Sequence, residues 1–172
     1  MPVIQDQWIE GSLTFDFPAN SMASKYDDWA HYRKQVQLAC GGHKAVDLVY
    51  ICANTLWLIE VKDYRNYPRT KVMNLADEVA LKVRDTLAGL VSAHCHASDA
   101  DERKFARKSL RCKKIRVVCH LEQPAQNSRL RPTPIDLSKV QLKLRTLLKC
   151  FDPHPAVVDR HSLQPTMDWQ VT

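Results

Sequence analysis

Two acidic residues and one lysine occupy positions that would meet if two β-rich segments of this sequence paired. Residues 45–63 contain the segments AVDLVYICA and TLWLIEVKD, separated by Asn54, a residue type that accepts the positive φ of a tight turn. If Asn54 and the alanine before it form a two-residue turn, Asp47 lies directly opposite Glu60. Lys62 shares their face because side chains alternate along a strand. The spacing therefore predicts two carboxylates and an ammonium group in contact on a β-hairpin.

This combination of groups suits the hydrolysis of phosphodiester bonds. Adjacent carboxylates repel each other unless a cation neutralises them, and their hard oxygen ligands favour Mg²⁺, with Mn²⁺ as a substitute. Asp47 and Glu60 would bind the metal, which would hold the phosphate and activate a water molecule. Lys62 would position that water or stabilise the developing charge. The alternative is a cross-strand ion cluster on an exposed sheet, which the apolar neighbours of the three residues disfavour.

The spacing of these residues also carries a family resemblance. Asp47, twelve intervening residues and the tripeptide Glu-Val-Lys at 60–62 resemble the PD-(D/E)XK motif of the restriction endonuclease-like nuclease superfamily. Val46 replaces the proline of that motif, which is not a metal ligand. The resemblance implies catalytic roles for Asp47, Glu60 and Lys62 and metal binding by the two acids.

The resemblance has further implications for the fold. It covers about residues 24–121 and implies an α/β restriction endonuclease-like sandwich, in which helices flank a mixed central β-sheet. The family places its hairpin after one helix and before another. Many members also carry a metal-binding carboxylate on the first helix, for which Asp27 or Asp28 is the candidate here.

Hydrophobic periodicity independently predicts the elements that would position these groups. Ser24 stands three residues before Asp27, as in a capping box, and aromatic residues follow at helical spacing. The predicted elements are helices at 25–38, 71–93, 100–110 and 136–150, strands at 45–53, 55–63, 114–121 and 156–159, and a proline-containing loop at 122–134. The first 20 residues suggest a loose arm or a short edge strand. Residues 1–172 thus form one domain, with a core at 24–121 and a C-terminal helix and strand at 136–160.

Lysine and arginine residues indicate an anionic partner. The formal net charge is +6, and eight Lys or Arg residues fall between Arg103 and Arg116. More cations alternate with tyrosines in residues 64–71, where they could bind phosphates while the tyrosines stack on unpaired bases. A solvated surface is the alternative for both segments. The candidate nucleic-acid-binding residues are Arg65, Arg69, Lys71, Lys82, Lys104 and Arg107.

Lys82 admits two interpretations. Glu78, Lys82 and Asp85 recur at i, i+4 and i+7, a spacing that favours a surface ladder of salt bridges on the helix. If that helix face turned toward the hairpin, Lys82 would instead bind a phosphate beside the carboxylates.

Other patterns bear on location and on competing classes of protein. The six cysteines form no CxxC pair, which is typical of free thiols in a reducing cytoplasm. The N-terminus does not resemble a secretory signal, and no apolar window is long enough to span a membrane. His94-Cys95-His96 lacks the second ligand pair of a zinc site. The sequence also lacks a GxxxxGK[ST] phosphate loop and a GxSxG nucleophile elbow.

Together these patterns predict a cytoplasmic, Mg²⁺-dependent nuclease that hydrolyses nucleic acid, DNA in preference to RNA. Cutting both strands would require a homodimer or a larger assembly, and no membrane partner is expected. The alternative is a catalytically inactive nucleic-acid-binding or assembly module with the same fold. A third interpretation is a basic interaction protein with an exposed hairpin.

Overall fold

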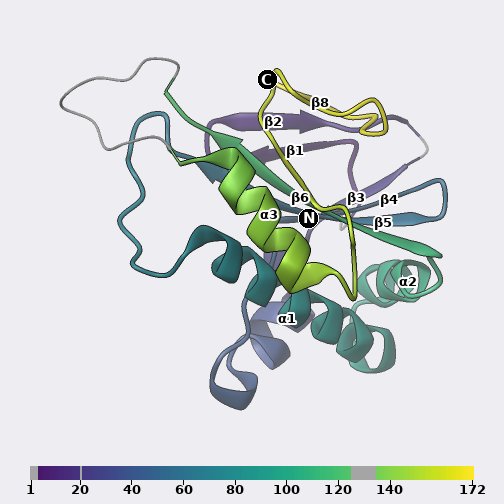
Figure 1. Ribbon diagram of the computed structural model, residues 1–172. Coiled ribbons are helices and arrows are strands. Elements are labelled where there is room, and N and C mark those ends of the chain that lie inside the picture. The colour runs from purple at the N-terminus through teal and green to yellow at the C-terminus, as the bar shows by residue number, and fades with distance from the viewer. Residues whose placement is uncertain (1–3, 20, 125–134) are drawn as a thin grey trace.

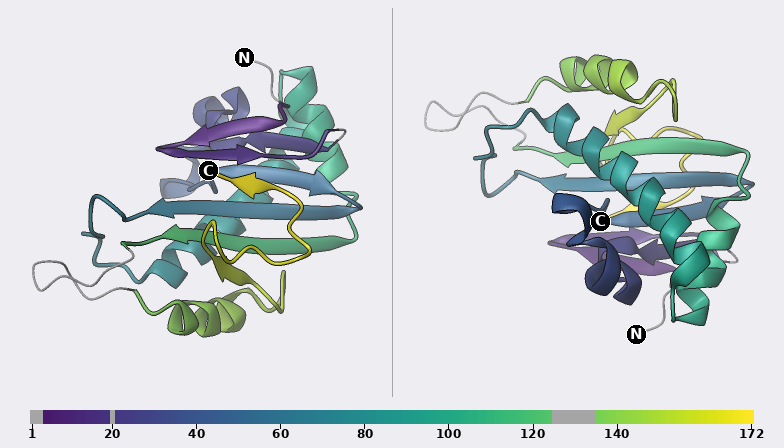
Figure 2. Two further views of the ribbon diagram at one scale, coloured as in Figure 1. Left: turned by 90° about the horizontal axis from the view of Figure 1, so that it is seen from above. Right: turned by 90° about the horizontal axis from the view of Figure 1, so that it is seen from below.

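The computed structural model describes residues 4–19, 21–124 and 135–172. These residues form three layers, in which a five-stranded sheet lies between a layer of helices and a three-stranded sheet (Figure 1). The two views of Figure 2 show the small sheet on one face of the central sheet and the helices on the other.

The central sheet is mixed, as predicted for an α/β protein. Its order is β3-β4-β5-β6-β7, with antiparallel pairing from β3 to β5 and parallel pairing from β5 to β7. The strands are β3 (Met22–Lys25), β4 (Leu48–Cys52), β5 (Thr55–Asp63), β6 (Lys114–Glu122) and β7 (Ala156–Val158). The predicted hairpin and the strands at 114–121 and 156–159 are therefore confirmed.

The register of the β4–β5 hairpin is the predicted one. Cys52 pairs with Thr55, and the pairing continues regularly down both strands. Ala53 and Asn54 have φ angles of 45° and 64°, the two positive values that a two-residue type I′ turn requires. Side chains alternate along a strand, and the even-numbered side chains of β5 from residue 56 to residue 62 face the helices.

Three helices cover one face of the central sheet: α1 (Leu75–His96), α2 (Ala100–Ser109) and α3 (Leu137–Leu148). Their apolar side chains share one core with that face. Side chains of Asn74, Asp99 and Asp136 accept backbone N–H bonds at the three N-termini, where unpaired donors need acceptors. The predicted helix at 71–93 begins later than expected, because Asn74 caps it and Val72 lies exposed before it.

A second sheet, unexpected from the sequence, covers the other face. It has the order β1-β2-β8 and contains β1 (Gln7–Glu10), β2 (Leu13–Asp16) and β8 (Gln170–Val171). Aromatic side chains including Phe15, Tyr50, Trp57 and Trp169 form a second core between the two sheets. Helices therefore flank the central sheet on one side only, and the N-terminal segment is not a loose arm.

The predicted helix at 25–38 is wrong. Ser24 does not cap a helix, because it lies in β3 and its Oγ accepts a hydrogen bond of 2.7 Å from Trp29 Nε1. A 3₁₀ turn at Tyr26–Asp28 and a π-helical turn at Tyr32–Val36 follow. The aromatic residues of this segment pack on one another, and that packing replaces the regular stripe of a helix.

Two remaining expectations concern the loop at 122–134 and membrane insertion. Most of that loop lies outside the described residues. Within the described part of the chain, no helix combines the length and apolar character needed to cross a membrane.

The contact between Gly89 of α1 and Tyr26 yields a test of this packing. A Cβ at Gly89 would overlap the Tyr26 hydroxyl, so Gly89→Ala should destabilise the protein by about 1–3 kcal/mol through overpacking. On an open helix face the same change would stabilise by about 1 kcal/mol. Urea denaturation would measure the effect.

The double substitution Tyr26→Phe with Gly89→Ala serves as the control. It should recover part of the loss, because it removes the overlapping hydroxyl, which is buried and forms no hydrogen bond with the described residues. A neutral or stabilising Gly89→Ala would contradict the described packing of α1.

Candidate functional site

The hairpin places a charged cluster at the end of an otherwise apolar face. Leu56 and Leu58 of β5 pack into the core beneath the helices, and Glu60 and Lys62 follow on the same face. Glu60 is completely buried. A buried charge is costly unless it is paired, so this face must supply partners for the carboxylate.

Two lysines and an aspartate surround Glu60. Its Oε1 lies 2.7 Å from Lys62 Nζ and 2.6 Å from Lys82 Nζ. Asp47 Oδ1 lies 3.3 Å from the same Lys82 Nζ, and Asp47 Oδ2 accepts a 2.7 Å hydrogen bond from Val61 N. The predicted juxtaposition of Asp47, Glu60 and Lys62 is therefore confirmed, and Lys82 joins them.

The interpretation of Lys82 as part of a surface ladder is wrong. Glu78 and Asp85 are both buried, and the helix face that carries them turns toward the hairpin. Glu78 Oε1 lies 3.3 Å from Lys62 Nζ, which links the helix to the hairpin a second time. The sequence did contain a sign of this orientation. Lys82 lies three residues after Val79 and directly before Val83, and both valines belong to the buried apolar stripe of α1.

Burial and neighbouring charges together set the pKa values of the groups in this cluster. Burial and the neighbouring Asp47 charge raise the pKa of Glu60 to about 7, although Lys82 and Lys62 oppose the shift. Burial also raises the pKa of Glu78, but hydrogen bonds from Lys71 and Arg69 outweigh it and lower the value to about 2. Burial lowers the pKa of Lys62, yet Glu60 beside it more than reverses this effect.

Asp27 and Asp28, the two candidates for a further metal ligand, lie in different surroundings. Asp28 is exposed and pairs with Arg33. Asp27 is half-buried, and burial together with the charge of Asp47 raises its pKa to about 6. Its buried Oδ1 has no hydrogen-bond partner in the described part of the chain. Asp27 is thus the acid of this segment that interacts electrostatically with the cluster.

The donor atoms fit a hard cation in part. Glu60 Oε2 is buried and has no partner among the described residues. Asp47 supplies a second carboxylate. No three His, Cys, Asp or Glu side chains of the described chain are arranged to bind a metal together. Binding of Mg²⁺ or Mn²⁺ by Asp47 and Glu60 therefore stays a prediction, because Lys82 already contacts both carboxylates.

The cations of the segment after β5 are largely paired within the protein. Arg65 binds Asp63 through Nε at 2.9 Å and Nη2 at 2.7 Å. Arg69 Nη2 lies 2.7 Å from Glu78 Oε2. Lys71 also pairs with Glu78 but leaves most of its side chain exposed.

Most cations of α2 and of the residues directly after it form no ion pair within the described part of the chain. Seven of them are exposed, and none forms an ion pair within the described residues: Arg103, Lys104, Arg107, Lys108, Arg111, Lys113 and Lys114. A cavity of about 140 Å³ is lined by His94, Ala100, Arg103, Lys104 and Arg107. An anionic partner could therefore bind these cations without displacing a carboxylate of the described residues.

The two basic segments lie at opposite ends of β5. The α2 segment ends beside the first residue of β5, since Lys113 N donates to Asn54 O. The loop with Arg65 begins after the last residue of β5. A strand of nine residues, about 26 Å from end to end, separates them.

Comparison with known proteins finds a cysteine-tRNA ligase from Neisseria meningitidis serogroup A. It is 35% identical over 176 aligned residues, which cover 83% of this chain and 25% of the ligase. The chain therefore spans about a quarter of the length of that relative. No family model matches the chain, and no solved structure matches it.

The predicted Mg²⁺-dependent nuclease is contradicted by this similarity. The relative carries the name of a ligase that acts on tRNA, not that of a nuclease or endonuclease, so the hydrolase and PD-(D/E)XK nuclease assignments are wrong. The geometry offers a physical reason. Asp47 and Glu60 are engaged by ammonium groups of the protein, and Glu60 is fully enclosed, whereas a nuclease must present its carboxylates to a phosphodiester.

Burial of Glu60 predicts a pH-dependent contribution to stability. Its pKa is about 7 in the folded protein and 4.5 in its ordinary state, so between these values the folded protein binds more protons than the unfolded chain. The free energy of unfolding then falls as the pH rises through that window. Wild type should lose up to about 3 kcal/mol relative to Glu60→Gln over this range. Urea denaturation at a series of pH values would measure the difference, and a constant difference would contradict the burial of an ionisable Glu60.

Proposed function

We propose that this chain is an RNA-binding module that binds tRNA without hydrolysing it. The observation that carries the proposal is the set of exposed cations on and after α2, for which the described protein provides no carboxylate partners. Neutralising phosphates with such groups releases condensed counterions, which supplies most of the affinity for a nucleic-acid backbone.

The packing of α2 supports this role. Glu102, Phe105, Ala106 and Ser109 are buried and hold one face of the helix against the protein. Both Glu102 carboxylate oxygens accept hydrogen bonds from the backbone at residues 30–31. The opposite face cannot turn inward, so its cations stay in solvent. Successive cations four residues apart advance about 6 Å along the helix and form rows that can follow a phosphate backbone.

The similarity to a tRNA ligase supports RNA over DNA as the partner. Only a quarter of that relative is matched, so the ligation reaction is not part of the proposal. The part proposed for this chain is contact with the tRNA. The cytoplasm is the proposed location, because it would keep the six cysteines in the free state found here.

We also propose that the finer architecture is the restriction endonuclease-like sandwich, used for binding. The hairpin, the cluster at its end and the following α1 support this assignment. In this proposal Lys62 and Lys82 neutralise the carboxylates and hold α1 against the sheet.

Charge reversal on α2 tests the proposed interface. Lys104→Glu with Arg107→Glu should weaken tRNA binding at least about tenfold. The slope of log affinity against log salt concentration should become shallower by about 1 for each cation lost. Different tRNA sequences should be affected alike, because phosphate contacts carry no sequence information. Fluorescence anisotropy across a range of salt concentrations would measure both quantities.

A matched control comes from α3, which lies at the β7 edge of the sheet, whereas α2 contacts β3 at the other edge (Figure 2). Lys139→Glu with Arg145→Glu makes the same change in net charge and should weaken binding far less. Equal effects of the two pairs, or no tRNA binding by wild type at low salt, would overturn the proposal.

A further inference from the structure

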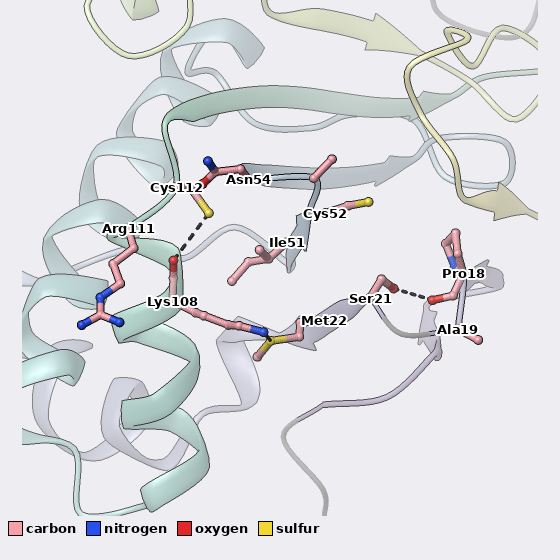
Figure 3. Close-up of a pocket in the computed structure, with 11 residues that line it drawn as sticks. Pro18, Ala19, Ser21, Met22, Ile51, Cys52, Asn54, Lys108, Arg111 and Cys112 are labelled. Carbon is pink, nitrogen blue, oxygen red and sulfur yellow. Dashed lines mark hydrogen bonds between the residues drawn. The ribbon is translucent and has the colours of Figure 1, made fainter.

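A cavity of about 410 Å³ opens between the tip of the β4–β5 hairpin and the end of α2 (Figure 3). Met22 and Ile51 contribute apolar walls, and Asn54, Lys108 and Arg111 contribute polar groups. This volume falls within the range of about 300–1,000 Å³ in which proteins bind small organic groups.

The charged residues among those described as lining the cavity, Lys108 and Arg111, are both cations. Lys108 Nζ lies 3.1 Å from Met22 Sδ, so its ammonium group sits over the apolar wall (Figure 3). Arg111 is exposed, and neither cation pairs with a carboxylate among the described residues. The described residues that line the cavity include no Asp or Glu. An anionic ligand with an apolar face therefore matches the lining.

A nucleotide has both of these properties. Its phosphate can bind Lys108 and Arg111, and its base can pack on Met22 and Ile51, since every base has an apolar face. Asn54 lies at the hairpin tip, and its carboxamide forms no hydrogen bond with the described residues. The carboxamide offers both a donor and an acceptor to the edge of a base.

The position of the cavity connects it to the proposed RNA-binding face. Lys108 lies in the last turn of α2, and Arg111 follows two residues after the helix ends, so both extend the series of cations that begins at Arg103. We propose that the cavity binds one unpaired nucleotide of an RNA strand whose backbone lies along α2. This inference rests on the proposed function and adds that the module selects RNA with a single-stranded segment.

The experiment compares two RNAs with wild type and three variants. One RNA is a blunt hairpin, and the other is the same hairpin with a short single-stranded overhang. Ala19→Trp fills the cavity from an exposed loop residue, and Asn54→Gly removes the carboxamide while keeping the positive φ. Ala88→Trp, on an exposed position of α1 outside the cavity lining, is the matched control. Thermal unfolding would verify that each variant is folded.

Wild type and Ala88→Trp should bind the overhang RNA at least about fivefold more tightly than the blunt RNA, because a stacked base adds affinity. Ala19→Trp should abolish this preference and leave the affinity for blunt RNA within about twofold, since phosphate contacts persist. Asn54→Gly should reduce the preference. Adenosine monophosphate should compete with the overhang RNA for wild type and not for Ala19→Trp.

Two results would overturn the inference: equal binding of both RNAs by wild type, or an unchanged preference in Ala19→Trp. If wild type binds both RNAs equally and the Lys104→Glu with Arg107→Glu variant binds neither, the cavity proposal fails and the RNA-binding module stands. If wild type binds neither RNA at low salt, the proposed function itself fails.

Discussion

A carboxylate with no access to water, that of Glu60, constrains how the elements of this protein pack together. Its charge requires cations nearby, and these come from β5 through Lys62 and from α1 through Lys82. Asp47 shares Lys82 and receives a backbone N–H from β5. The cluster therefore holds α1 in one position over the hairpin. Because only residues 97–99 connect α1 to α2, the same constraint also limits where α2 can lie.

Two groups of cations in this protein have different consequences. Those near the hairpin end, such as Lys62, Lys82 and Arg69, compensate buried carboxylates. Those on α2 form no ion pair with any carboxylate of the described residues. Net charge alone does not separate the two groups, although the second can attract a polyanion without breaking ion pairs of the described residues. The proposed nucleic-acid contact therefore lies at α2, beside the start of β5, and not at the end of β5 that carries the predicted catalytic residues.

The second sheet explains why the hairpin is buried on both faces. Strands β1 and β2 come from the start of the described chain, and β8 comes from its end. Trp57 on the outward face of β5 packs against Trp169, with ring centroids 5.1 Å apart. Strands of two to four residues carry little periodic signal, and the pairing of β2 with β8 joins residues about 155 positions apart. Local patterns could not predict this layer.

The sequence by itself determined the elements and contacts that depend on local rules. The two-residue turn at Asn54 set the hairpin register, and that register placed Asp47, Glu60 and Lys62 together. Apolar periodicity was sufficient for α1, α2, α3, β6 and β7. Only the tertiary structure decided that Lys82 completes the cluster and that residue 19, the hairpin tip and α2 share a cavity. Those contacts join distant segments, and their geometry follows from how helices pack on a sheet, which no short stretch of sequence encodes.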